Sequence, residues 1–162
     1  MKTAIVYYSM GGNTEFAAKK IADKIDADLI RIEPEKSYPD KGFKKFLWGG
    51  KSAVMGDTPK LLPYEFDADK YDCIIFGYPV WASNFTPPIK TFIKANMEKI
   101  YGKQFAVFAC SMGGGAEKSF DKLKNFLLID DFKAKLSLID PKDKPSEENN
   151  KKIDSFISDL EK

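Results

Sequence analysis

The stretch TAIVYYSMGGNTEFAAKKIADKI, residues 3–25, joins an apolar run, a glycine turn and an amphipathic segment in direct succession. The run Thr3–Tyr8 is apolar on both faces, which is typical of a strand in the interior of a parallel sheet. From Asn13 to Ile25 the apolar residues recur at helical spacing, so this segment predicts an α-helix. A strand followed by a turn and a helix is the first half of a βαβ unit.

Similar pairs of apolar run and amphipathic segment follow along the chain. Two further runs are continuous and apolar, Tyr71–Gly77 and Gln104–Cys110. Two others are short or alternating, Leu29–Glu33 and Leu136–Ile139. Continuous runs belong in the middle of a parallel sheet and the others at its edges. The sequence therefore predicts an α/β fold, a single doubly wound domain over residues 1–162 with five parallel strands in the order 2-1-3-4-5.

The starts of two later helices are marked by capping residues. Thr86 stands before Pro87 in the position of an N-cap, and a proline is well tolerated in the first turn. Ser146 precedes Glu147 and Glu148, whose charges suit a helix N-terminus. We expect both hydroxyls to cap their helices.

Composition restricts the chemistry that the chain itself can perform. The 162 residues include 26 basic and 24 acidic side chains, a net charge of +2, and no histidine. The absence of histidine excludes Ser-His-Asp and Cys-His nucleophiles and zinc sites with imidazole ligands. The two cysteines, Cys73 and Cys110, lie in apolar runs and are interpreted as core residues in a reducing compartment. We therefore expect no catalytic residue and no metal, and any redox chemistry would depend on a bound cofactor.

The same composition argues against two classes of partner. Arg31 is the only arginine and the lysines are spread along the chain, so the clustered arginine typical of nucleic-acid binding is missing. No apolar run approaches the roughly 20 residues that cross a bilayer, and no signal peptide precedes the first apolar run. We expect a cytoplasmic protein with no nucleic-acid or membrane partner.

Small and polar residues gather where the first central strand ends. The segment Ser9–Thr14 combines hydroxyls, an amide and two glycines at the start of a helix. Glycine lets backbone N–H groups turn toward a ligand, and the helix N-terminus favours an anion, so the segment suits a phosphate. It contains no lysine or arginine, and we expect uncharged donors to bind that phosphate. Ordinary helix capping is the alternative interpretation.

The loops after the third and fourth strands add aromatic and small residues. Trp81 and Phe85 lie in the segment Tyr78–Pro87, where they suit a flat aromatic ligand or simply cover the end of the sheet. Ser111–Gly115 would let a ligand edge approach backbone N–H groups, or is an ordinary glycine-rich turn. Because the carboxyl ends of these strands share one edge, the three loops together predict one ligand site.

One connection is much longer than the others. Residues 35–70 separate the second and third strands, and this segment is rich in lysine. Its apolar residues predict a helix broken at Gly49–Gly50: Phe43, Phe46, Leu47, Ala53, Val54 and Met55. With Trp48, the segment is interpreted either as a solvated amphipathic helix or as a lid or nucleotide site.

At these loops the chain resembles the flavodoxin family over nearly its whole length. The resemblance is carried by SMGGNT at 9–14, GYPVW at 77–81 leading into TPPIKTFI at 86–93, and ACSMGGG at 109–115. It implies flavin mononucleotide (FMN) as the cofactor. By position it implies that the 5′-phosphate is bound by Ser9, Met10, Gly11, Gly12, Asn13 and Thr14. The ribityl chain and isoalloxazine ring would lie against Pro79, Val80, Trp81, Ala82, Asn84 and Phe85, with Trp81 as the stacking residue. The pyrimidine edge would face Ser111, Met112, Gly113 and Gly114.

The resemblance implies an electron-transfer protein, a monomer or weak dimer, that exchanges electrons with redox partner proteins. The alternative is an FMN-dependent NAD(P)H:quinone or flavin oxidoreductase. Two features depart from the family. The net charge is +2 where flavodoxins are usually strongly acidic, and the segment Tyr78–Lys90 lacks the glycine that many flavodoxins place there. Among these residues Asn84 is the one we expect to tolerate a positive φ.

Overall fold

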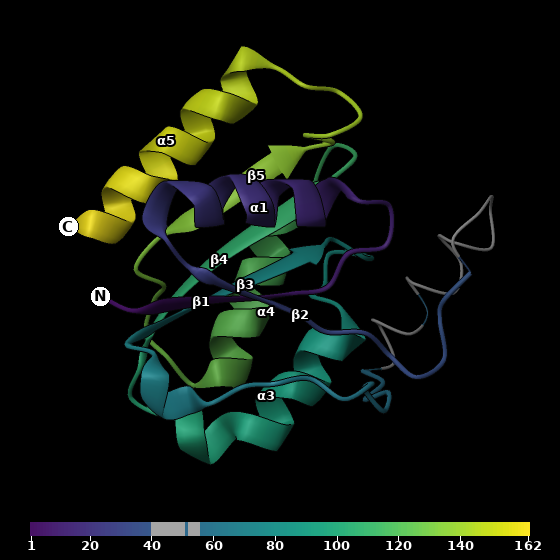
Figure 1. Ribbon diagram of the computed structural model, residues 1–162. Coiled ribbons are helices and arrows are strands. Elements are labelled where there is room, and N and C mark those ends of the chain that lie inside the picture. The colour runs from purple at the N-terminus through teal and green to yellow at the C-terminus, as the bar shows by residue number, and fades with distance from the viewer. Residues whose placement is uncertain (40–50, 52–55) are drawn as a thin grey trace.

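The computed structural model describes residues 1–39, 51 and 56–162 and contains one five-stranded sheet (Figure 1). All its strands are parallel and their order is β2-β1-β3-β4-β5. The strands are β1 (Thr3–Tyr7), β2 (Asp28–Arg31), β3 (Cys73–Pro79), β4 (Gln104–Ser111) and β5 (Lys135–Ile139). The α/β class and the strand order predicted from the sequence are confirmed.

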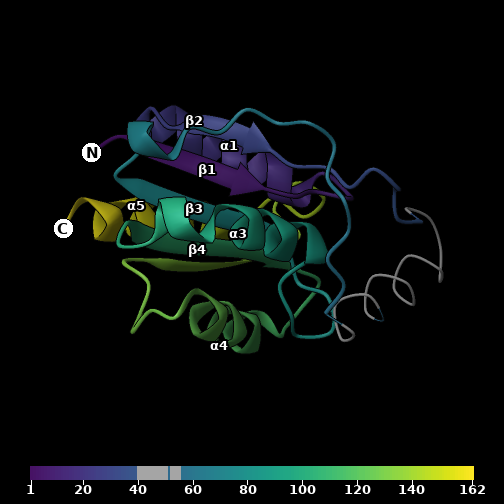
Figure 2. The ribbon, with the colours of Figure 1, turned by 90° about the horizontal axis from the view of Figure 1, so that it is seen from below.

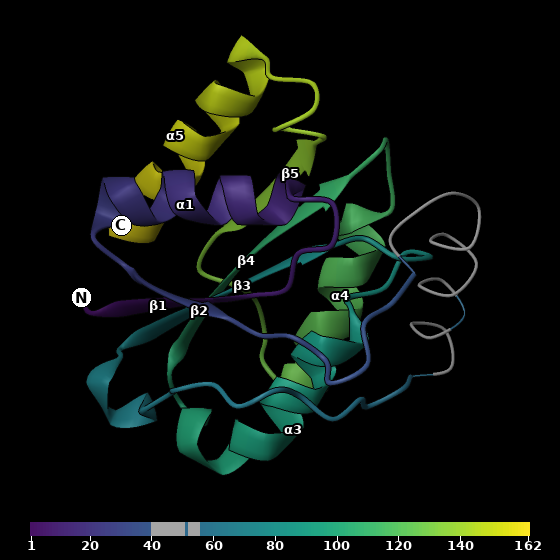
Figure 3. The same ribbon diagram turned by 45° about the vertical axis from the view of Figure 1, so that its right-hand side comes forward.

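Helices cover both faces of the sheet. They are α1 (Asn13–Ile25), the short 3₁₀ helix η1 (Ala68–Lys70), α3 (Pro87–Ile100), α4 (Ala116–Leu127) and α5 (Glu147–Glu161). α1 and α5 lie on one face, and α3 and α4 on the other (Figures 1 and 3). Figure 2 looks onto the face that α3 and α4 cover. In the described segments no helix is long and apolar enough to cross a membrane.

Each face of the sheet carries its own core. Successive residues of β1 point to opposite faces, so Ile5 packs beside α1 and α5, while Ala4 and Val6 pack beside α3 and α4. All five residues of β1 are buried. Each large apolar side chain that is fully buried contributes about 1.5–3 kcal/mol relative to exposure, so this double burial holds the central strands, and with them their carboxyl ends, in place.

The third strand lies further along the chain than the apolar run predicted. It begins at Cys73 because the Tyr71 N–H donates to Ala68 O and closes η1. It continues through Tyr78 and Pro79, which stay paired with β4. Tyr78 is fully buried, and its hydroxyl lies 3.1 Å from Ser119 Oγ on α4. Pro79 therefore belongs to a strand end and not to the loop that follows.

The predicted helix in the connection between β2 and β3 lies outside the described residues, as do Trp48 and Gly49–Gly50. The described flanks of this connection pack on the body of the protein. Pro34 and Leu61 form an antiparallel bridge, and the Thr91 hydroxyl of α3 donates to Pro59 O at 2.8 Å. Both ends of the connection are thereby fixed beside β2 and α3.

Candidate functional site

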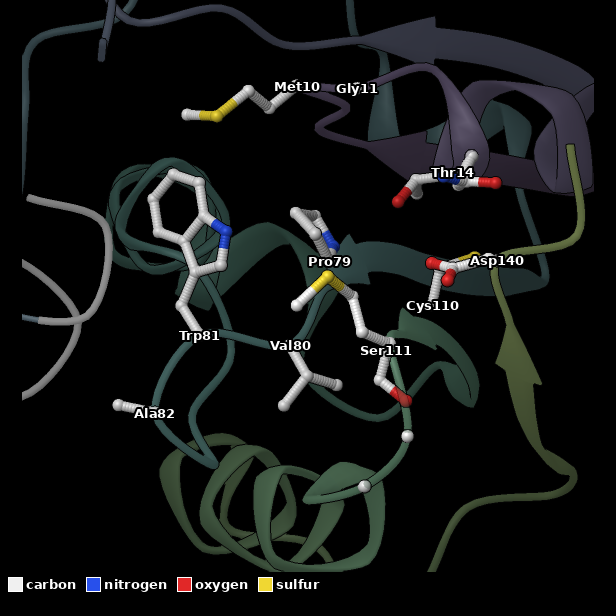
Figure 4. A pocket seen from close by; sticks show the side chains of 14 residues that line it. Met10, Gly11, Thr14, Pro79, Val80, Trp81, Ala82, Cys110, Ser111 and Asp140 are labelled. Carbon is white, nitrogen blue, oxygen red and sulfur yellow. The ribbon is translucent and has the colours of Figure 1, made fainter. Parts of the chain in front are cut away.

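A cavity of about 440 Å³ lies where β1, β3 and β4 end (Figure 4). Its volume falls within the range of small-molecule sites, roughly 300–1,000 Å³. The lining from the β1 loop is Met10, Gly11, Asn13 and Thr14; from the end of β3, Pro79, Val80, Trp81 and Ala82; and from the end of β4, Cys110, Ser111, Met112, Gly113 and Gly114, with Asp140 after β5. The structure thus brings the three predicted loops together at one edge of the sheet. Ser9, Gly12, Asn84 and Phe85 lie outside this lining.

The first loop is shaped by Gly12, which has a φ of 91° and precedes α1 without a side-chain cap. A positive φ of this size is readily adopted only by glycine. The buried Ser9 hydroxyl accepts a hydrogen bond from the Glu15 N–H at 3.2 Å, so this side chain supports the loop from beneath. The first N–H groups of a helix have no partners within the helix and together favour an anion. At α1 the Ser9 hydroxyl accepts from one of them, that of Glu15.

Arg31 of β2 braces the same loop from outside. Its guanidinium donates to Ser9 O at 3.4 Å and to the Glu15 carboxylate at 2.8 Å, and it also pairs with Glu33. The pKa of Glu15 is lowered, chiefly by a hydrogen bond from Lys19 and also by Arg31. The sole arginine of the sequence therefore positions the loop and does not line the cavity.

The side chain of Asn13 is bound to the segment between β5 and α5. Its Oδ1 accepts from the backbone N–H groups of Lys142 (2.8 Å) and Asp143 (3.3 Å), and its Nδ2 donates to the Asp143 carboxylate at 2.9 Å. These contacts use the amide oxygen and one of the two N–H donors of the amide. The role of Asn13 as a phosphate donor stays a prediction for the remaining N–H. The same contacts bring the Lys142 side chain over Gly12.

Cys110 and Asp140 line the polar end of the cavity beside Thr14 (Figure 4). Burial raises the pKa of the Cys110 thiol to about 12, so the group is protonated at neutral pH and is a poor nucleophile. The Asp140 N–H donates to Ser111 O at 3.1 Å, and its carboxylate pairs with Lys144 at 3.1 Å. Cys110 was expected only as a core residue, and Asp140 was not among the predicted site residues. Asp140 follows β5 directly, so extending the strand-end rule to the fifth strand finds it.

Trp81 forms the aromatic side of the cavity. Its ring stands nearly perpendicular to those of Tyr8 and Tyr38, at centroid distances of 5.7 and 5.1 Å. Such edge-to-face contacts fix the orientation of an indole. In Figure 4 the indole and the Met10 side chain lie on the same side of the cavity, opposite Thr14 and Asp140. One end of the cavity is therefore apolar and aromatic, and the other is polar.

A tight turn after Trp81 precedes Asn84 and Phe85, which lie outside the cavity lining. Trp81 and Asn84 exchange backbone hydrogen bonds, and the residues between them have positive φ, 49° at Ala82 and 56° at Ser83. Two positive φ values in a two-residue turn are the type I′ pattern. Asn84 was the expected site of a positive φ, but it closes the turn and donates to Ala82 O. Phe85 packs on Tyr78 and Phe126 instead.

No metal-binding cluster of three or more histidine, cysteine or acidic side chains occurs within residues 1–39, 51 and 56–162. Of the cavity-lining residues in this part of the chain, Cys110 and Asp140 are those with an ionisable side chain. The lining therefore consists mainly of backbone N–H groups, hydroxyls and apolar side chains. Such a lining can hold and orient an amphipathic ligand, whereas the side chains offer little acid–base chemistry.

Comparison with known proteins gives concordant results. A family model described as flavodoxin matches residues 2–141. The flavoprotein of Lactobacillus acidophilus NCFM, solved in complex with FMN, is 24% identical with a TM-score of 0.71, over 96% of this chain and 98% of that one. A candidate flavoprotein of Bacteroides eggerthii DSM 20697 is 25% identical with a TM-score of 0.75, over 99% and 98%. Another from Bacteroides uniformis ATCC 8492 is 29% identical with a TM-score of 0.66, over 85% and 88%.

Proposed function

Because the chain belongs to the flavodoxin family, we propose that its cavity binds FMN and that the protein is an electron carrier. The observation that carries this proposal is the cavity itself, in which a helix N-terminus and an indole lie at opposite ends. FMN has the matching chemistry, an anionic phosphate at one end and a flat aromatic ring system at the other. The related flavoprotein of L. acidophilus, which binds FMN, supports the same ligand.

The residues that line the cavity fit the parts of this ligand. Thr14 and the N–H groups of the first loop would bind the phosphate, since a helix N-terminus with hydroxyl donors is a favourable anion site. Trp81 and Met10 would contact the isoalloxazine ring, which gains from aromatic and thioether contacts. Gly113 and Gly114 leave backbone N–H groups accessible to the polar edge of that ring.

The bound flavin would supply the redox chemistry, and the chain would bind it, orient it and limit its contact with water. A carrier needs no acid or base beside its cofactor. The two ionisable groups of the lining are poorly suited to either role, because the Cys110 thiol stays protonated and the Asp140 carboxylate is paired with Lys144. We accordingly propose redox proteins as the partners of this chain.

The test begins with protein freed of flavin. Titration with FMN should give saturable binding and quench the flavin fluorescence, because an indole lies at the apolar end of the cavity. Anaerobic stepwise reduction of the complex should then show electrons taken up one at a time. Absence of binding would overturn the FMN proposal. Rapid oxidation of NAD(P)H in the presence of a quinone acceptor would show that the protein is a reductase and would overturn the electron-carrier proposal.

A further inference from the structure

A lysine from a distant part of the sequence, Lys142, lies beside the glycine turn of the first loop. A Cβ placed on Gly12 would lie 3.0 Å from Lys142 Nζ and 3.3 Å from Lys142 Cδ. The Lys142 side chain therefore extends across Gly12, and its ammonium lies beside the first turn of α1. Although the segment Ser9–Thr14 has no basic residue of its own, the fold places Lys142 over its glycine turn, in addition to Arg31, which donates to Ser9 O from outside the cavity.

The backbone beneath this lysine is held firmly. The Lys142 N–H donates to Asn13 Oδ1 at 2.8 Å, and Asp143 bonds the same amide through both its N–H and its carboxylate. On the other side, the Lys144 N–H donates to Asp140 O at 2.7 Å. Because the Lys142 backbone is bound to Asn13, the first residue of α1, its side chain stays within reach of the N-terminus of that helix.

The charge of Lys142 is also uncommitted. In the described part of the chain no carboxylate forms an ion pair with it, whereas its neighbour Lys144 pairs with Asp140 at 3.1 Å. A helix N-terminus with an unpaired ammonium beside it attracts an anion more strongly than uncharged donors alone. Of the two carboxylates in this segment, that of Asp140 pairs with Lys144, whereas that of Asp143 accepts from Asn13 Nδ2 at 2.9 Å and offsets part of the positive charge.

We infer that Lys142 is a phosphate-binding residue of the flavin site, which compensates part of the charge of the FMN phosphate. This inference rests on the proposed function, and it replaces the expectation that uncharged donors alone hold the phosphate. An ammonium at the surface is screened by water and salt, so the effect is moderate. It depends on the charge of the side chain and is absent for a flavin without phosphate.

The test compares FMN with riboflavin, which lacks the phosphate. In Lys142→Met, which keeps the apolar stem over Gly12, the FMN dissociation constant should rise about three- to tenfold and riboflavin binding should not change. The fall of FMN affinity with added salt should also become shallower. Lys142→Arg should retain most of the affinity. Lys99→Met controls for net charge, because Lys99 is an exposed lysine in the last turn of α3, at the C-terminal end of that helix.

The possible outcomes distinguish a failure of the Lys142 inference from a failure of the proposed FMN binding. If the wild-type protein binds FMN and Lys142→Met binds it equally well with the same salt dependence, Lys142 has no role at the phosphate. Equal losses for FMN and riboflavin would also overturn the inference, since they would assign Lys142 to packing over Gly12. If the wild-type protein binds neither flavin, the proposed function itself fails.

Discussion

At the scale of single residues, Trp81 carries the aromatic half of the site. Trp81→Ala removes the ring at the cavity, so we expect FMN affinity to fall about tenfold and the fluorescence of bound flavin to recover. Trp81→Phe keeps an aromatic surface against Tyr8 and Tyr38 and should lose much less affinity. Fluorescence titration of both variants measures the effect. Undiminished quenching in Trp81→Ala would remove this residue from the stacking role.

At the scale of elements, two helix starts that look alike in sequence differ in the structure. The Ser146 hydroxyl accepts from the Asn149 N–H at 3.1 Å, so Ser146→Ala should cost about 1 kcal/mol of unfolding free energy. Thr86 precedes two prolines that lack N–H groups, and its buried Oγ1 has no partner among the described residues. Thr86→Val should therefore be neutral or stabilise by about 1 kcal/mol. Urea unfolding measures the unfolding free energy of both variants. Equal losses of unfolding free energy in the two variants would contradict the prediction.

The same comparison indicates what the sequence can predict. The spacing of apolar residues predicts the α1 bounds and the strand order, because burial on one face of a helix or on both faces of a central strand determines that spacing. It cannot predict that β3 runs on to Pro79, because that depends on pairing with β4. Nor can it direct Phe85 away from the cavity, since the turn at Ala82 and Ser83 decides that. The contact of Lys142 with Gly12 joins residues that are remote in the chain, and no local pattern reports it.

At the scale of the whole molecule, the distribution of shifted pKa values predicts how stability depends on pH. Burial raises the pKa of Cys73 to about 11 and that of Cys110 to about 12. Hydrogen bonds to lysine, tyrosine or backbone groups lower the pKa of surface carboxylates, among them Glu15, Asp28 and Asp131. The folded state therefore binds more protons than the unfolded state at alkaline pH and fewer at acidic pH.

We expect the unfolding free energy to be nearly constant between about pH 5.5 and pH 8, because the sequence has no histidine to titrate there. It should fall above about pH 8.5, where unfolded thiols ionise, and fall again below about pH 4.5 as the carboxylates are protonated. Urea unfolding of the flavin-free protein across this range measures it. In Cys110→Ala the alkaline fall should be smaller while the acid limb is unchanged. A steep slope near pH 6.5, or an alkaline limb unaffected by removing the thiol, would show that other groups govern the titration.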